Sequence, residues 1–494
     1  MNHFDICVIG GGPSGYAAAM RGLDFGKRVL LVEKARLGGA GIHNGALSSK
    51  TLWELSCAFM KVKQKDLGYN VKDYGLSYSE VMREALRAVE EKEEQMQYQI
   101  NELQREICAD RFRYIRGFGE MKSDKNVAVK VGDEVKEYGV ENIILATGGR
   151  PRWLPEIPID EKTILTSDGV GNLDHFPESF VILGAGVIGC EFATVFANFG
   201  KTKVFLIDKA ERILPFEDAD ISSVVAANLE RSGVCIHRNA SLQSMTIENG
   251  KVKYVLNYGD GSCETYFAEK ALVSVGRVIN IENMGIEKLG LDVNKRGSFV
   301  VDDCRTNIKN IYAVGDLTAD VCLVNVGELE GRHSVEKICT NKTDILTYEN
   351  VSTIMFLHPE VAGVGMNETE AMQKGISSYR VATYGYRFIN RALAMRSVQG
   401  FFKILVSDDD EMRILGMRAI GEHASSTIQA VALLIHMKKG IEELAELIHP
   451  HPSIVEGVQE CVRMLLGKSI MKPDVFREHL SCYRVVGGVY QPLR

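Results

Sequence analysis

Short apolar runs alternate with helical stretches through the first 350 or so residues of the chain. Residues 4–34 show the order most clearly: an apolar strand, a glycine-rich turn, a helical run, and a second apolar strand that ends at Glu33. Residues 179–209 repeat this order, and their second strand ends at Asp208. Units of strand, turn, helix and strand with roughly 30 residues are typical of βαβ folds around a parallel sheet.

The pattern changes after about residue 350. Strand-like runs at 401–407 and 413–421 precede a helical run at 426–440, which predicts a third domain of the α+β class. Between the two βαβ units, residues 78–110 form a long charged helical pattern. We expect a solvated scaffold helix there, with no part in the chemistry.

Length and composition fit this division. At roughly 100–200 residues per domain, 494 residues predict about three domains. No uninterrupted apolar run reaches the 18 or so residues of a transmembrane helix, and a net charge of -7 argues against nucleic acid or an anionic membrane as a partner. The start of the chain has no basic segment typical of a signal peptide, so we expect a cytoplasmic protein. The eleven cysteines include no C-x-x-C pair, and we expect no metal site.

Each βαβ unit carries a Gly-x-Gly-x-x-Gly turn after its first strand. The glycines are Gly10, Gly12 and Gly15 in the first unit and Gly184, Gly186 and Gly189 in the second. The first glycine makes the tight turn, the second admits a pyrophosphate, and the third lets helix pack on strand. The acids Glu33 and Asp208 would accept a hydrogen bond from a ribose hydroxyl. Because glycines, strands and acid agree twice, 174 residues apart, we predict two dinucleotide sites rather than two unrelated turns.

Two dinucleotide sites in one chain indicate electron transfer between two bound cofactors. Three more strand ends support this interpretation: ILATGGRP (144–151), VSVGRVIN (273–280) and NIYAVGDL (310–317). An acid such as Asp316, directly after an apolar strand, suits a buried hydroxyl such as a ribityl chain. Taken alone, each of the three could equally be an ordinary strand end.

These segments, together with HPEVAGVG, ILGMRAIG and HPHPSIVE, resemble the flavoprotein pyridine nucleotide–disulfide oxidoreductases, most closely their dihydrolipoamide dehydrogenase branch. The match covers about residues 4–473. The resemblance implies an α/β fold with two Rossmann-like domains, for FAD and NAD, plus a C-terminal α+β dimerisation domain and a homodimer. The implied domains are 1–150 and 276–347 for FAD, 151–275 for NAD, and 348–494 for dimerisation.

The resemblance also implies roles for single residues. Glu33 would hold the adenosine ribose of FAD, and Asp316 its ribityl chain. Further cofactor contacts would come from Lys34, Gly39, Gly117, Thr147, Gly148, Gly149, Gly276 and Gly315. Asp208 favours NAD over NADP, although Lys209 and Arg212 leave that choice open.

Lys50 and Glu191 match a lysine and a glutamate that pair beside flavin N5 in this family. A cation there stabilises reduced flavin, and the carboxylate makes its burial tolerable. From the residues alone, a surface lysine and an unrelated helical acid would fit as well.

The redox segment departs from the family. The family reads Gly-Gly-Thr-Cys-x-Asn-x-Gly-Cys-x-Pro-Ser-Lys, whereas residues 38–50 read GGAGIHNGALSSK. Gly41 and Ala46 stand where the two redox cysteines are expected, within a retained frame. A dithiol relay needs both thiols, so we do not expect one here. Cys57 lies two helical turns beyond Lys50, too far to substitute, and we interpret it as a core thiol.

His451 and Glu456 match the acid/base histidine of the family and the glutamate that orients it. Two interpretations stay open: the pair braces the dimer as a relic, or His451 protonates a different acceptor near the flavin. We interpret His449 as structural, while His43, inside the altered loop, is a candidate neighbour of the flavin.

The sequence therefore predicts an FAD enzyme that takes hydride from NADH at flavin N5 and passes electrons to a small-molecule acceptor without a dithiol relay. One alternative is a non-catalytic FAD-bound paralogue that scaffolds or regulates a complex. Another is residual dihydrolipoamide dehydrogenase activity by a different route.

Overall fold

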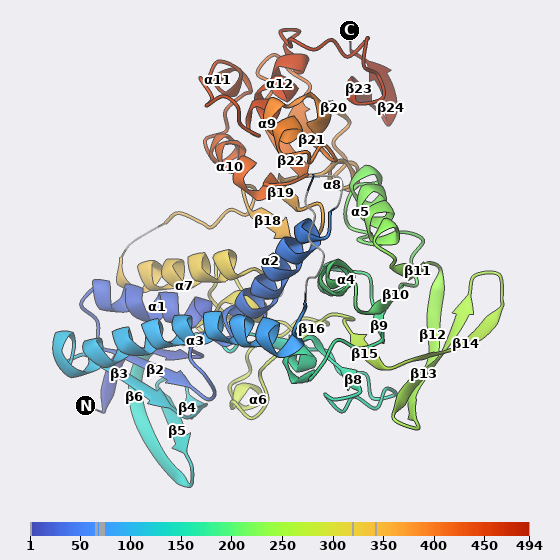
Figure 1. Ribbon diagram of the computed structural model, residues 1–494. Helices are drawn as coiled ribbons and strands as arrows, with labels where there is room; N and C mark the ends of the chain where they lie inside the picture. Colours follow the sequence, from blue (N-terminus) through green and yellow to red (C-terminus); the bar gives the residue numbers. More distant parts are fainter. Residues whose placement is uncertain (1, 65–67, 69–74, 319–320, 341–342, 494) are drawn as a thin grey trace. The chain divides into compact units, whose positions relative to one another are not determined.

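The structure is a computed structural model that describes residues 2–64, 68, 75–318, 321–340 and 343–493. The chain forms two compact units (Figure 1). The first comprises Met1–Leu55, Asn70–Phe176 and Leu272–Leu346. The second comprises Ser56–Tyr69, Pro177–Ala271 and Thr347–Arg494. The finer division at residues 150, 275 and 347 stays a prediction.

The first unit is built on a sheet in the order β3-β2-β1-β6-β5-β4, with β17 also paired to β6. The parallel strands are β1 (His3–Ile9), β2 (Val29–Glu33), β3 (Phe112–Arg116), β6 (Glu134–Leu145) and β17 (Ile311–Ala313). The antiparallel strands are β4 (Phe118–Ser123) and β5 (Asn126–Val131). All five residues of β2 are buried, as expected for a strand covered on both faces.

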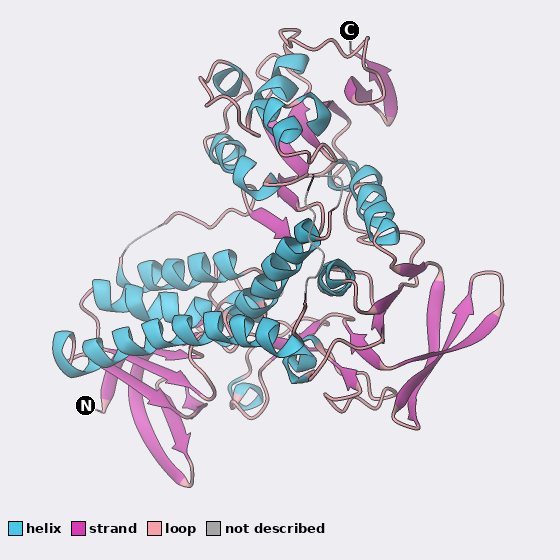
Figure 2. Ribbon diagram, in the orientation of Figure 1, coloured by secondary structure: helices cyan, strands magenta, loops and turns pink. Residues whose placement is uncertain are grey.

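Three helices lie side by side over one face of this sheet (Figures 1 and 2). They are α1 (Pro13–Asp24), α3 (Tyr78–Glu102) and α7 (Val324–Cys339). Helix α1 begins at Pro13, which suits the first helical position because its missing N–H would have no helical partner there. Apolar side chains of all three helices, such as Ala18, Val89 and Val335, share one core with β1 and β2.

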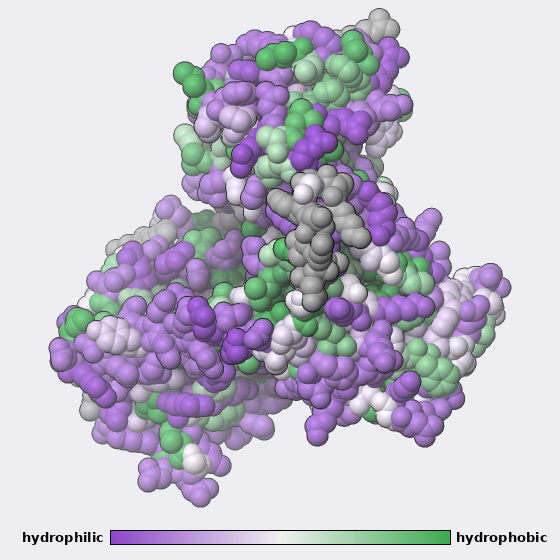
Figure 3. All heavy atoms as spheres, in the orientation of Figure 1, coloured by the Kyte–Doolittle hydropathy of each residue, from purple (hydrophilic) through white to green (hydrophobic). Residues whose placement is uncertain are grey.

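The predicted helix at 78–110 is shorter than expected. It begins after Ser77, whose side chain accepts a hydrogen bond from the Glu80 N–H, and it passes into a π-helical turn at Leu103–Ile107. Residues 108–111 then turn into β3. Its surface is mostly hydrophilic, as the charge pattern predicts (Figure 3).

The second unit begins with a parallel layer in which β11, β10 and β9 lie in that order. Its elements are β9 (Ser179–Leu183), α4 (Val187–Phe199), β10 (Lys203–Ile207), α5 (Ala219–Arg231) and β11 (Cys235–His237). Three antiparallel strands follow, β12 (Ala240–Glu248), β13 (Lys251–Tyr258) and β14 (Cys263–Ala268). The strand–turn–helix–strand order predicted for 179–209 is confirmed.

The C-terminal part of this unit is an antiparallel sheet in the order β18-β19-β22-β21-β20-β23-β24. Its strands are β18 (Ser352–Met355), β19 (Val361–Gly365), β20 (Ser378–Gly385), β21 (Phe401–Ser407), β22 (Ile414–Ile420), β23 (Leu480–Val486) and β24 (Val489–Pro492). The α10 (Gln429–His436) and α12 (Glu456–Leu465) helices share a core with it.

The two strand predictions of this region are confirmed by β21 and β22. The helical run predicted at 426–440 is wrong at both ends. A 3-10 turn at Ala424–Thr427 precedes α10, which ends at His436, two residues before Lys438, whose φ of 54° is left-handed. Within the described part of the chain, no helix is both long and apolar enough to span a bilayer.

Candidate functional site

The first glycine turn forms an open cradle at the start of α1. A Cβ on Gly10, whose φ is +112°, would overlap the Ala146 carbonyl, and a Cβ on Gly15 would overlap the Gly10 carbonyl. Gly12 differs, because a Cβ there would meet nothing within 4 Å. Gly12 is also the N-cap of α1 and provides no side-chain cap. The first N–H groups of α1 therefore face open space, which suits a pyrophosphate.

Glu33 closes this cradle from the end of β2. Its Oε2 accepts a hydrogen bond from the Gly11 N–H at 2.6 Å, and its Oε1 accepts one from the Ala35 N–H at 2.7 Å. The residue is 9% exposed. Because each carboxylate oxygen has two lone pairs, both oxygens keep one for a further donor such as a ribose hydroxyl.

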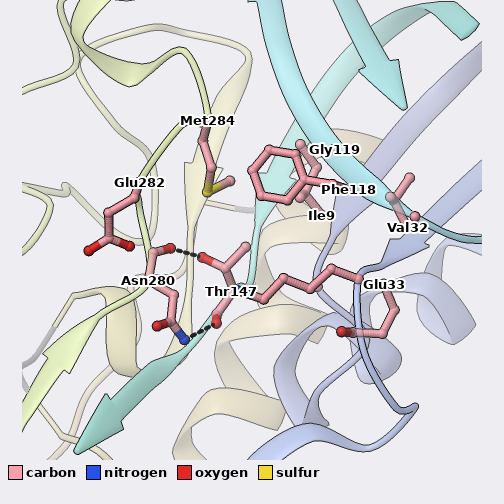
Figure 4. Close-up of a pocket in the computed structure, with 12 residues that line it drawn as sticks. Ile9, Val32, Glu33, Phe118, Gly119, Thr147, Asn280, Glu282 and Met284 are labelled. Carbon is pink, nitrogen blue, oxygen red and sulfur yellow. Dashed lines mark hydrogen bonds between the residues drawn. The ribbon is translucent and has the colours of Figure 1, made fainter. Parts of the chain in front are cut away.

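A small cavity opens beside this carboxylate (Figure 4). The predicted residues that line it are Gly10, Glu33, Lys34, Gly117 and Thr147. The sequence did not single out Ile9, Val32, Phe118, Gly119, Asn280, Glu282 and Met284, which complete the lining. Apolar walls around a carboxylate suit an adenosine, with a flat apolar base and a polar sugar.

Two hydrogen bonds join the strand ends that line this cavity. Thr147 Oγ1 donates to the Asn280 carbonyl at 2.6 Å, and Asn280 Nδ2 donates back to the Thr147 carbonyl at 3.0 Å (Figure 4). Asn280 ends the quoted segment VSVGRVIN, so the strand-end signal was present in the sequence. What the sequence could not show was the pairing across 133 residues.

Asp316 lies where the third strand end meets the first. Arg277 places its Nε 3.3 Å from Asp316 Oδ2 and donates a second hydrogen bond to the Gly149 carbonyl. Gly315 has a φ of +68°, and its N–H donates to the buried carboxylate of Glu330 at 2.6 Å. The structure thus brings Gly149 and Asp316 together, and it adds Arg277, which the sequence analysis missed.

The altered loop begins with Gly38 and Gly39, both at positive φ, and continues as a 3-10 turn at Gly39–Gly41. A Cβ on Gly41 would lie 2.5 Å from Pro13 Cγ. Ala46 begins α2 (Ala46–Val62). A side chain at residue 41 would therefore require the Pro13 ring or the loop to shift.

Two polar side chains of this region are at least half-buried. Lys50 lies on α2, and its Nζ donates to Ser49 Oγ at 3.3 Å. The His43 side chain is 9% exposed, with Nε2 2.7 Å from the Leu37 carbonyl oxygen. Cys57, further along α2, is half-buried and accepts a weak hydrogen bond from Asn198 Nδ2 at 3.7 Å.

The second glycine turn has the same construction as the first. Gly184 has a φ of +101°, and a Cβ on Gly186 would meet nothing within 4 Å. Asp208 accepts hydrogen bonds from the Ala185 N–H and the Ala210 N–H, both at 2.8 Å. Gly189 is buried in α4. The second turn therefore leaves open space at the start of α4, as the first does at α1.

Glu191 is the charged residue of the buried helix α4. It is 7% exposed, and its Oε1 accepts a hydrogen bond from the Phe356 N–H at 3.0 Å. Lys50 belongs to the first unit and Glu191 to the second, so their predicted pairing stays a prediction.

His451 and Glu456 are brought together at the start of α12. His451 Nδ1 lies 2.7 Å from Glu456 Oε1, and Glu456 Oε2 accepts from the Ser453 N–H at 2.8 Å. Burial would raise the pKa of Glu456, but the Ser453 N–H and His451 outweigh it and lower the pKa. The Glu456 carboxylate therefore faces Nδ1 of His451. Burial lowers the pKa of the nearby His449, consistent with a structural residue.

Sequence comparison identifies two family profiles in the chain. The profile described as "Pyridine nucleotide-disulphide oxidoreductase" matches residues 4–339, and its dimerisation domain matches residues 351–462. The dihydrolipoyl dehydrogenase of Chlamydia muridarum is 33% identical over 474 residues, covering 95% of this chain and 98% of the relative. A dihydrolipoyl dehydrogenase of Bacillus subtilis is 32% identical over 477 residues, covering 94% of this chain and 99% of the relative.

Solved structures share the fold. LpdA from Mycobacterium tuberculosis superposes with a TM-score of 0.84 at 24% identity, covering 93% of this chain and 99% of that one. The HOCl-induced flavoprotein disulfide reductase RclA from Escherichia coli, as its Cu(II) complex, gives a TM-score of 0.82 at 24% identity. That match covers 94% of this chain and 100% of RclA. At this identity the likeness concerns the fold alone.

Proposed function

The chain belongs to the pyridine nucleotide-disulphide oxidoreductase family, and from this premise we propose that it oxidises NADH through FAD without a dithiol relay. Enzymes of this family use FAD and NAD(H). The electrons would pass from the flavin to a small-molecule acceptor. The C-terminal dimerisation domain of the chain supports a homodimer.

The first cradle fits FAD. Gly12 leaves the space for the pyrophosphate, Glu33 keeps lone pairs for the adenosine ribose, and Asp316 supplies an acid for the ribityl chain. Phe118 and Met284 would cover the adenine. When bound, FAD supplies a ring that accepts a hydride and releases electrons singly or in pairs. The second cradle, with Gly186 and Asp208, would hold NADH in the same manner.

Lys50 and Glu191 would set the charge around the flavin. Lys50 would provide the cation that favours the reduced ring, and Glu191 the carboxylate that pairs with it. The hydrogen bond from the Phe356 N–H holds the Glu191 carboxylate in place.

The loop at residue 41 carries the proposal. A thiol relay requires sulfur at two positions close to the flavin. Gly41 and Ala46 occupy the positions at which the family motif has cysteine, and a Cβ on Gly41 would press against Pro13. Electrons would therefore leave the flavin without passing through this loop.

His451 would serve as the proton donor for the acceptor. Glu456 orients the imidazole through Nδ1, so a proton would be given at Nε2. The His451 side chain is 62% exposed within the single chain, which leaves it accessible to a partner subunit or an acceptor. If the pair only braces the dimer, His451→Gln will change the dimer dissociation constant and leave turnover intact.

Anaerobic titration with NADH tests the proposal directly. We expect the flavin absorbance to bleach with one equivalent of NADH and no long-wavelength thiolate–flavin band to develop. The Gly186→Ala variant, which should keep FAD, is the control and should not bleach at the same NADH concentration. A protein that binds FAD but is not reduced would contradict the proposal, and so would a charge-transfer band.

Dihydrolipoamide oxidation is the second candidate, because the full-length relatives are named dihydrolipoyl dehydrogenases. An acceptor series of a quinone, oxygen, a second nicotinamide and lipoamide distinguishes the two. Turnover with the first three and none with lipoamide supports the relay-free enzyme. If lipoamide turns over, Cys57→Ser shows whether that thiol takes part.

A further inference from the structure

A chain of hydrogen bonds in the second unit begins at an exposed thiol. Cys235 lies on the edge strand β11, and its Sγ is 3.7 Å from Nε2 of His237, two residues further along the same strand. His237 Nδ1 lies 2.7 Å from the Tyr258 hydroxyl, which lies 2.8 Å from the Tyr266 hydroxyl. The Tyr266 hydroxyl in turn donates to the Glu264 carboxylate.

The carboxylate at the end of this chain fixes the direction of every bond. A carboxylate can only accept hydrogen bonds, so the Tyr266 hydroxyl donates its one proton to Glu264 and must accept a hydrogen bond from Tyr258. The Tyr258 hydroxyl therefore donates to Tyr266 and must accept a hydrogen bond from His237 Nδ1–H. A neutral His237 with its proton on Nδ1 has its lone pair on Nε2, the nitrogen that faces Cys235. The imidazole is thereby oriented as a base toward the thiol.

The surroundings change the pKa of two groups in this chain of hydrogen bonds, His237 and Tyr266. Burial lowers the pKa of His237, and Glu264 opposes this only in part. Burial and the hydrogen bond to Glu264 raise the pKa of Tyr266. Phe205 of β10 stacks on His237 with a centroid distance of 6.2 Å, and Lys203 Nζ lies 5.2 Å from the centre of the Phe205 ring. Tyr254 stacks on Tyr266 with a centroid distance of 5.3 Å, and it also lies within electrostatic range of Cys235.

We propose that Cys235 is a reactive thiol, activated by His237, that undergoes reversible exchange with small disulfides. Sγ gives its proton to His237 Nε2 and attacks one sulfur of the disulfide. The new bond from Cys235 to that sulfur forms as the original S–S bond breaks. The departing sulfur takes the proton back from the imidazolium and leaves as a thiol, so no outside oxidant or reductant is consumed.

The chain provides its own control for this reaction. Cys263 on β14 is also exposed, and its Sγ donates to the amide oxygen of Gln243 at 3.2 Å. An amide oxygen cannot take the thiol proton at neutral pH. Cys235 and Cys263 therefore differ in the presence of a base rather than in exposure.

The experiment incubates the full-length FAD-loaded protein with oxidised glutathione near neutral pH and follows each cysteine by peptide mass spectrometry. We expect Cys235 to form the mixed disulfide about tenfold faster than Cys263, because a positioned base assists only one of them. His237→Asn should remove this advantage while leaving the Cys263 rate unchanged. Tyr258→Phe, which deprives Nδ1–H of its acceptor, should lower the Cys235 rate by a smaller factor.

A pH series separates base assistance from simple exposure. The Cys235 rate should level off once His237 is neutral, whereas the Cys263 rate, which no base assists, should keep rising with pH. Equal rates at the two cysteines would overturn the proposal, as would an unchanged Cys235 rate in His237→Asn. An unaltered Cys263 rate and FAD content show that each variant is folded, and Tyr258→Phe remains as the test if His237→Asn is not.

Discussion

The two glycine turns are built alike, but the helices that follow them, α1 and α4, differ in burial. In each, an acid at the end of the second strand accepts from the N–H after the first glycine and from the N–H two residues beyond itself. Helix α1 is partly exposed, whereas α4 is buried from Gly189 to its end. At the position of Ala17 in the first copy, the second copy has Glu191. The shared turn thus fits a nucleotide, and the helix behind it carries what differs between the copies.

A substitution that disrupts the backbone of the first glycine turn should have the largest effect, on the free energy of unfolding. Gly15→Ala places a Cβ inside the Gly10 carbonyl oxygen, where backbone must move. We expect a loss of about 3 kcal/mol or more in the free energy of unfolding. Urea denaturation of the purified protein measures it. Gly12→Ala is the matched control, since its Cβ meets nothing. All proteins are compared in the FAD-free form, because bound FAD would itself add stability. Equal stability losses for the two variants would contradict this account of the turn.

Filling the two cradles should separate the two cofactors. Gly12→Ala places a methyl group in the space assigned to the FAD pyrophosphate, so we expect a folded but colourless protein. Gly186→Ala does the same in the second copy and should leave FAD bound while raising the NADH concentration needed for reduction by about a hundredfold. Flavin content and NADH titration measure both. Loss of flavin from the Gly186 variant would show that the assignment of the copies is reversed.

Acid should distinguish two carboxylates that are held differently. Burial would raise the pKa of Asp303, but hydrogen bonds from the Leu346 N–H, Lys337 and His333 lower it to about 2. A carboxyl whose folded pKa lies below its unfolded value stabilises the protein above about pH 4, and this contribution is lost as the pH falls through 2. It amounts to about 2 kcal/mol.

We therefore expect Asp303→Asn to lower the free energy of unfolding at pH 6 and to flatten its decline between pH 4 and pH 2. Denaturant unfolding at a series of pH values measures both changes. Asp208→Asn serves as the comparison, because Asp208 accepts hydrogen bonds from the Ala185 and Ala210 N–H groups and contacts no cation within the described part of the chain. A parallel pH dependence of wild type and Asp303→Asn would show that this carboxyl contributes nothing.

The smallest effect sharpens the comparison at the acids. Asp208→Asn keeps one acceptor oxygen, which can serve either the Ala185 N–H or the Ala210 N–H. The amide NH2 group then faces the other N–H and cannot accept from it. We expect about a tenfold rise in the KM for NADH, the equivalent of one lost hydrogen bond, with FAD content unchanged. Steady-state kinetics with a quinone acceptor measures it. An unaltered KM would remove Asp208 from the NADH site.

Features of the site that lie within one short segment could be predicted from the sequence. Contacts between residues far apart in the sequence could not. The glycine turns, their acids and the His451–Glu456 contact lie within short segments whose geometry the motif dictates. Phe118, Asn280 and Met284 reach the cavity from elements far from Glu33 in the sequence, and only the folded sheet brings them together. Arg277 beside Asp316 is of the same kind.

Helix limits failed for a different reason. The helical pattern at 426–440 continues past the real end of α10, because the backbone of Lys438 adopts a left-handed conformation that periodicity does not reveal. The predicted pairing of Lys50 with Glu191 involves residues of two different units, so neither local motif could determine it.

The limited space beside Gly41 bears on how this loop could regain its cysteines. A mutation that gives residue 41 any side chain forces its Cβ to 2.5 Å from the proline ring, so the loop must shift before a sulfur atom can be used. Restoring a dithiol in this loop would take at least two substitutions, at residues 41 and 46, and the first of them requires the Pro13 ring or the loop to move.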